Sequence, residues 1–97
     1  MPAYLIARVH VTDPVRYKEY TALSPAAIAK HGGRFLVRGG PVTTLEGPAE
    51  NDRVVVIEFP TMAQATAFWT SPDYEHAKTK RKGAADAQFI LMDGFGG

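Results

Sequence analysis

A transition from helix to strand to turn is encoded in His31-Gly-Gly-Arg-Phe-Leu-Val-Arg-Gly-Gly-Pro41. Two glycine pairs bracket a short run of strand-forming residues with an arginine at each end, Arg34 and Arg38. Glycine ends helices and turns strands because it adopts the left-handed backbone conformation without strain. Neither pair opens a helix after a strand, so turn geometry explains them better than a phosphate-binding loop does. The segment therefore predicts a helix that ends near residue 31 and a strand over residues 34–38.

The same kinds of signal place the other helices and strands. The remaining strands are predicted, from alternating or continuous apolar residues, over residues 3–11, 53–59 and 86–93. Asp13-Pro14 begins a helix that runs to the first glycine pair, and Pro25 predicts a kink or a restart within it. Thr61-Met-Ala-Gln64 has the spacing of a capping box and begins a second helix. Ser71-Pro72 begins a further helix, which runs to about residue 83.

This order of elements, β-α-β-β-α-β, is typical of a ferredoxin-like α+β fold. We expect a four-stranded antiparallel sheet with the helices on one face. The strands over residues 3–11 and 53–59 are predicted to lie side by side and parallel, joined by the helical crossover. Residues 1–97 are predicted to form a single domain, because a chain of this length supports one modest core.

Composition excludes several classes of protein. The formal net charge of +1 gives no electrostatic basis for binding nucleic acid or an anionic membrane. The basic run Lys78–Lys82 suits the end of a helix, where cations interact well with the helix dipole. The chain has no cysteine, which excludes disulfides, thiolate metal sites and a cysteine nucleophile. Because no signal peptide or membrane span is recognisable, we expect a soluble cytoplasmic protein.

Alternation along the strands divides the sheet residues into two sets. One set is apolar and is predicted to face the helices: Leu5, Ala7, Val9, Val11, Phe35, Val37, Val55, Ile57, Phe59, Phe89 and Leu91. The other set mixes apolar and charged residues: Tyr4, Ile6, Arg8, His10, Arg34, Leu36, Arg38, Val54, Val56, Glu58, Gln88, Ile90 and Met92. Monomers rarely expose an apolar area of this kind, so we expect a homodimer whose two sheets face one another.

Charged residues of the mixed set are predicted to converge at one end of the sheet, namely Arg8, His10, Arg34 and Glu58, together with Gln88. Glu58 is the only acid among them, with Arg34 and either Arg8 or His10 as its expected partners. Two interpretations remain open, because interface ion pairs perturb charges much as active sites do. In one, His10 and Glu58 are catalytic, and the substrate is bound by Arg8, Arg34 and Arg38. In the other, the charges form an ion-pair network across the dimer interface.

Aromatic residues and histidines supply further candidates. Trp69 and Tyr74, on either side of Ser71-Pro72, either form a substrate-binding lid over an apolar ligand or pack in the core and at its edge. Tyr17 and Tyr20 share a helix face and either hydrogen-bond a ligand or pack. The histidines have no close sequence spacing, so no metal site is predicted.

The chain resembles the domain of unknown function 1330 family (DUF1330) of the dimeric α+β-barrel superfamily. The residues that carry the resemblance are Gly32-Gly-Arg-Phe-Leu-Val-Arg-Gly-Gly40, Val54-Val-Val-Ile-Glu-Phe-Pro60, Phe68-Trp-x-Ser-Pro-x-Tyr74, Gly83-Ala-Ala-Asp86 and Met92-Asp-Gly94. Superfamily relatives include cofactor-free monooxygenases, small isomerases and haem-degrading or haem-binding proteins. The resemblance implies a dimer with ligand cavities between sheet and helices, and it transfers no catalytic residue.

Three functions are consistent with these features. The first is binding or transformation of a small organic molecule in a pocket by the sheet, with no tightly bound cofactor. The second is a non-enzymatic dimeric binding or stress-related module in which the charges of the sheet stabilise the interface. The third is haem binding, which a lone histidine on a strand supports poorly.

Overall fold

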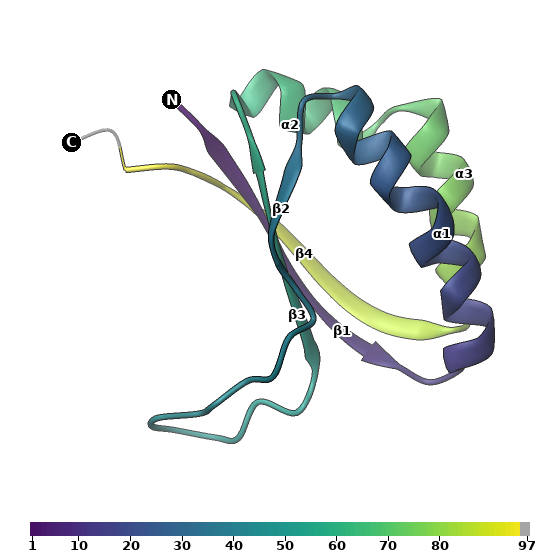
Figure 1. The fold of residues 1–97 in the computed structure, drawn as a ribbon, viewed down its shortest axis with the longest axis vertical. Helices are drawn as coiled ribbons and strands as arrows, with labels where there is room; N and C mark the ends of the chain where they lie inside the picture. The colour runs from purple at the N-terminus through teal and green to yellow at the C-terminus, as the bar shows by residue number, and fades with distance from the viewer. Residues whose placement is uncertain (96–97) are drawn as a thin grey trace.

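The computed structural model describes residues 1–95 and shows a four-stranded antiparallel sheet with all helices on one face (Figure 1). In chain order the elements are β1 (Ala3–Val11), α1 (Pro14–Lys30), β2 (Arg34–Arg38), β3 (Arg53–Phe59), α2 (Met62–Trp69), α3 (Pro72–Arg81) and β4 (Ala85–Asp93). The strands are arranged β2-β3-β1-β4. This is the predicted ferredoxin-like α+β fold. None of the helices in the described residues has the length and hydrophobicity that crossing a lipid bilayer requires.

Side-chain caps begin the helices where the sequence predicts them. The carboxylate of Asp13 accepts a hydrogen bond from the amide of Arg16 at 3.1 Å. Thr61 Oγ1 accepts from the amide of Gln64 at 3.1 Å, and Ser71 Oγ accepts from the amide of Tyr74 at 3.2 Å. Each cap satisfies a backbone donor that the first turn leaves without a partner. The first helix continues through Pro25, so the chain does not restart at that residue.

The pairing of β1 with β3 corrects one prediction. The two strands are neighbours, but they run antiparallel, with Tyr4 opposite Glu58 and Val9 opposite Arg53. The expected parallel pair was wrong because α1 joins β1 to β2, which run in the same direction without being neighbours. The connection from β2 to β3 reverses the chain direction, so β3 is antiparallel to both β2 and β1.

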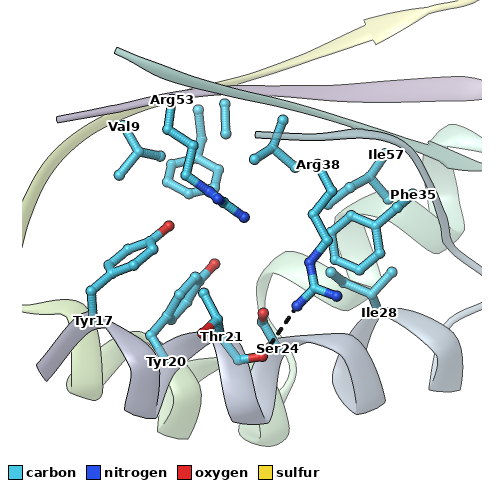
Figure 2. Close-up of a pocket in the computed structure, with 13 residues that line it drawn as sticks. Val9, Tyr17, Tyr20, Thr21, Ser24, Ile28, Phe35, Arg38, Arg53 and Ile57 are labelled. Carbon is cyan, nitrogen blue, oxygen red and sulfur yellow. Dashed lines mark hydrogen bonds between the residues drawn. The ribbon is translucent and has the colours of Figure 1, made fainter. Parts of the chain in front are cut away.

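A β-bulge in β2 corrects a second prediction. Phe35 lies opposite Ile57, but Val37 already lies opposite Val56, so Leu36 is an extra residue in β2. An extra residue reverses the alternation beyond it. Val37 therefore shares the open face of the sheet and is 44% exposed. Arg38, predicted on the open face, lies instead on the side of the helices (Figure 2).

The core lies between the sheet and the helices, and its largest fully buried side chains are Tyr74, Phe59, Phe68, Leu5 and Val9. Full burial of a side chain of this size contributes about 1.5–3 kcal/mol. No helix formed by residues 1–95 lies over the opposite face of the sheet (Figure 1). Large apolar side chains there are about half exposed: Leu36 at 46%, Ile90 at 45% and Met92 at 50%.

Candidate functional site

A small cavity lies between α1 and the helix-facing side of the sheet (Figure 2). Its volume is about 30 Å³, which is room for a water molecule or two. The apolar part of its wall consists of Ala7, Val9, Ile28, Phe35, Val55, Ile57 and Phe89. The polar part consists of Tyr17, Tyr20, Thr21, Ser24, Arg38 and Arg53. The cavity thus combines an apolar wall with a few polar groups that converge on one space.

Arg53 is the less exposed of the two arginines that line this cavity. It is the first residue of β3, and alternation with Val55 and Ile57 directs its side chain toward the helices. Figure 2 shows its guanidinium extending from the sheet into the space above Tyr17 and Tyr20. Its Nε atom is buried and has no hydrogen-bond partner among the described residues.

Gly39 allows Arg53 to take this position. The backbone φ of Gly39 is +68°, in the left-handed region that favours glycine. A Cβ atom at Gly39 would overlap the Arg53 guanidinium, so any other residue would displace it. The glycine that the sequence indicated as a turn residue therefore also makes room for a cavity residue.

Arg38 bridges β2 and α1 at the outer side of the cavity. It is exposed, and its Nη2 donates a hydrogen bond of 3.3 Å to the carbonyl oxygen of Thr21. Its Cζ lies 4.6 Å from the centre of the Phe35 ring, which is within the range of a cation–π contact. The bridge is long and solvent-exposed, so it can open at low free-energy cost.

The two tyrosines of α1 point their hydroxyl groups toward the sheet (Figure 2). The Tyr20 hydroxyl lies 2.9 Å from the hydroxyl of Tyr74, which also accepts a 3.3 Å hydrogen bond from Arg81. Burial raises the pKa of Tyr20 well above its usual range, so this group stays protonated. Burial also raises the pKa of Tyr17, against the opposing charge of Arg53. Both rings are packed in the core and both residues line the cavity.

The charged cluster predicted on the mixed face is divided into two groups. At one end of the sheet, Arg34 Nε donates to Glu58 at 2.9 Å, as predicted. Tyr4 donates to the same carboxylate at 3.1 Å, and this hydrogen bond raises the pKa of Tyr4. These three residues form the Glu58 group, on the open face.

Arg8 and His10 form the second group, together with Glu50 and Asp52, which were not predicted as their partners. Arg8 Nε donates to Glu50 at 2.8 Å, and His10 Nδ1 lies 3.1 Å from Asp52. Arg8 is four residues from Tyr4 along β1, roughly 13 Å at the usual rise per residue. The prediction that Arg8 and His10 converge with Arg34 and Glu58 is therefore wrong. It followed from the parallel pairing, which placed the wrong ends of the strands together.

Tyr74 packs in the core, Trp69 packs half-buried at its edge, and neither residue lines the cavity. The Trp69 ring lies 5.2 Å from the rings of both Tyr74 and Phe89, and Lys78 Nζ lies 4.6 Å from its centre. Tyr74 is fully buried. A lid role for these two residues over an apolar ligand stays a prediction, although neither ring lies at this cavity. Within residues 1–95, no three histidine or acidic side chains lie close enough to hold a metal ion.

Arg53 was not among the predicted site residues, although the sequence contains a signal for it. Arg53 is separated from Val55, Ile57 and Phe59 by even numbers of positions, so its side chain points to the same face of the strand. Those three residues were predicted to face the helices. An arginine in phase with buried apolar residues places a charge on the core side of a sheet, which is costly without a partner. That cost is the kind of signal that marks a functional residue.

A family model described as a domain of unknown function, DUF1330, matches residues 2–95. The chain belongs to the DUF1330 family. None of the curated proteins matches it. The family assignment covers the cavity, the open face and both charged groups.

Several solved structures have the same fold as this DUF1330 chain. A protein of unknown function from Rhodopseudomonas palustris is 23% identical, with a TM-score of 0.74 over 97% of this chain and 82% of that one. SnoaB, a cofactor-independent oxygenase from Streptomyces nogalater, is 15% identical, with a TM-score of 0.65 over 97% and 93% of the two chains. A dimeric ferredoxin-like protein of unknown function from Jannaschia sp. CCS1 is 11% identical, with a TM-score of 0.65 over 96% and 99%. At these identities the likeness establishes the fold and leaves the activity open.

Proposed function

We propose that this protein binds a small organic molecule in the cavity between α1 and the sheet, and that it does so as a homodimer. The observation that carries the proposal is the placement of Arg38 and Arg53 beside apolar side chains in the layer where a closed core would otherwise form. Binding sites for small molecules have this composition, with mostly apolar walls and a few directed polar groups.

The small volume of the cavity is consistent with this role if the Arg38 bridge opens. At about 30 Å³ the cavity is much smaller than an ordinary ligand site. Among the described residues, the polar and cation–π contacts of Arg38 are one long hydrogen bond to Thr21 and the contact with Phe35. Outward rotation of its side chain enlarges the space next to Arg53 without a change in the backbone.

The open face of the sheet is the proposed dimer interface. Leu36, Val37, Ile90 and Met92 are each close to half exposed on this face. The two charged groups lie on it as well, with Glu58 and Glu50 each paired to an arginine. A structural neighbour from Jannaschia sp. CCS1 is described as dimeric, which supports an assembly of this kind.

The positions of the charged groups favour an interface role for Arg8, His10, Arg34 and Glu58 over a catalytic one. None of these four residues lines the cavity. The second function considered from the sequence, a dimeric binding module, therefore accounts for them. His10, the histidine that lies on a strand, is paired with Asp52 on the open face, and this pair gives haem binding no support. The proposal also allows for a reaction of the bound molecule, because the guanidinium groups of Arg38 and Arg53 could stabilise negative charge that develops on it.

Protein-detected NMR with a set of small aromatic probes tests the proposal. We expect binders to shift the signals of Tyr17, Tyr20 and Phe35 and to leave those of Ile90 and Met92 unchanged. Ala7→Val adds volume to the cavity wall and should abolish these shifts. Ala87→Val, the same change at an exposed position of β4, is the matched control and should preserve them. Shifts confined to the open face would contradict the proposal.

A further inference from the structure

The two cavity arginines lack acidic partners. Among residues 1–95, no aspartate or glutamate lines the cavity. Across residues 1–95 the ion pairs are Arg8–Glu50, His10–Asp52, Lys30–Asp73 and Arg34–Glu58, and none of them involves a cavity residue. Two positive charges therefore face the same small space without a carboxylate to balance them.

Arg53 is also incompletely hydrogen-bonded. Its Nε is buried without a partner, although a guanidinium carries five donors that water or an acceptor normally satisfies. A charged group left in this state is destabilising, and an apolar side chain of similar size would fill the position at lower cost. An anionic ligand that accepts from Arg53 removes that cost.

We propose that the cavity ligand is an organic carboxylate, bound through Arg53 and Arg38 with its apolar part against Phe35, Ile57 and Phe89. This inference rests on the proposed function and specifies the chemical class of the ligand. A carboxylate has two oxygens in the spacing of the guanidinium fork, so one arginine can bind both of them. The apolar wall excludes a ligand that is polar on all sides.

The cavity suits a carboxylate better than a phosphate. A phosphate group carries more charge and more acceptor oxygens, and it commonly uses backbone amides at a helix N-terminus. This cavity lies beside the middle of α1, where the backbone amides are bonded within the helix. The donors that remain are the two guanidinium groups and the hydroxyl groups of Tyr17 and Ser24, because Thr21 donates its hydroxyl to the carbonyl oxygen of Lys18.

Isothermal titration calorimetry on the 97-residue chain, with matched acids and amides, tests this inference. The probe pairs are acetate and acetamide, isobutyrate and isobutyramide, and benzoate and benzamide, at neutral pH where the acids are ionised. They separate the effect of charge from that of size. We expect at least one acid to bind about tenfold or more tightly than its amide, as charge-assisted hydrogen bonds provide.

Arg53→Gln should weaken binding of the acid by about tenfold or more and leave binding of the amide within about twofold. Unchanged amide binding also shows that the cavity of the variant is intact. Arg16→Gln removes an exposed arginine of α1 outside the cavity and should change neither affinity.

Several results would overturn the inference. Equal affinities of acid and amide for the wild-type chain would leave the proposed function standing and refute the anionic ligand. Undiminished binding of the acid to Arg53→Gln would refute the role of Arg53. Tighter binding of inorganic phosphate than of any acid would refute the carboxylate class. If no probe of either kind binds, the proposed function itself fails.

Discussion

Arg38 donates a hydrogen bond to the carbonyl oxygen of Thr21, and so bridges the edge strand β2 and the helix α1 (Figure 2). In a regular helix this carbonyl would accept from the amide four residues later. That residue is Pro25, which has no amide hydrogen. The proline inside the helix thus leaves free an acceptor that a cavity residue uses, and the bulge at Leu36 brings that residue to the correct face.

Removal of the Arg38 side chain should open the cavity at little cost in stability. For Arg38→Ala we expect the free energy of unfolding to fall by about 1 kcal/mol or less, because the lost contacts are exposed. A bound neutral probe such as benzamide should exchange faster, as measured by NMR line shapes. Arg34→Ala, at the other end of the same strand, is the control and should not alter exchange. Equal exchange rates in wild type and Arg38→Ala would show that Arg38 does not close the cavity.

Gly39 and Gly40 provide a matched pair of substitutions. Alanine at Gly39 meets both a left-handed backbone and the Arg53 guanidinium, so we expect a loss of about 1–2 kcal/mol in unfolding free energy and weaker binding of carboxylate probes. Alanine at Gly40 has no atom within 4 Å and should change stability by about 0.5 kcal/mol or less. Urea denaturation measures both changes. Equal stabilities of the two variants would contradict the role given to Gly39.

The sequence was sufficient to predict the fold because its signals were local. Asp13, Thr61 and Ser71 cap the predicted helices, and the strands over residues 34–38 and 53–59 have the predicted bounds. Alternation placed Leu5, Val9, Ile57 and Phe59 correctly in the core. Each of these signals depends on neighbours within a few residues, and none depends on strand direction.

The site could not be predicted in the same way, because it depends on how the strands pair. The bulge in β2 has no clear signature within Arg34–Arg38, yet it reverses the faces of Val37 and Arg38. The assumed direction of β3 placed Glu58 next to His10, whereas Glu58 lies opposite Tyr4. Glu50 and Asp52 reach β1 from the loop before β3, and loop positions cannot be derived from alternation.

The ion pair between Arg8 and Glu50 should be visible in the dependence of stability on pH. The hydrogen bond from Arg8 lowers the pKa of Glu50 below its ordinary value of 4.5. A carboxylate with a lower pKa in the folded state stabilises the fold above its unfolded-state pKa, and this contribution is lost as pH falls through the folded-state pKa. The stability difference between wild type and Glu50→Gln should therefore shrink as pH is lowered from about 6 to about 3.

Urea denaturation across this pH range measures that difference. Glu46→Gln removes an exposed acid from the same loop that has no ion pair among residues 1–95, and it controls for the general loss of charge. A difference between wild type and Glu50→Gln that is constant with pH would mean that the pair with Arg8 does not persist in solution.

The open face should hold the dimer together. Met92 is half exposed there, and Met92→Glu places a charge in the apolar patch that we propose packs against a second sheet. We expect sedimentation velocity to show a dimer for wild type at micromolar concentration and a monomer for Met92→Glu. Val15→Glu, an equivalent change at a residue of α1 that is 80% exposed, should remain dimeric. A monomeric wild-type chain at this concentration would refute the proposed homodimer.

The position of a bound carboxylate tests the central claim most directly. A crystal structure of the protein soaked with the tightest binder among acetate, isobutyrate and benzoate should show density between α1 and the sheet. The two oxygens should lie within hydrogen-bond distance of the Arg53 guanidinium, with Arg38 rotated or shared between ligand and Thr21. Density on the open face beside Arg8 and His10, with the cavity unchanged, would contradict the account.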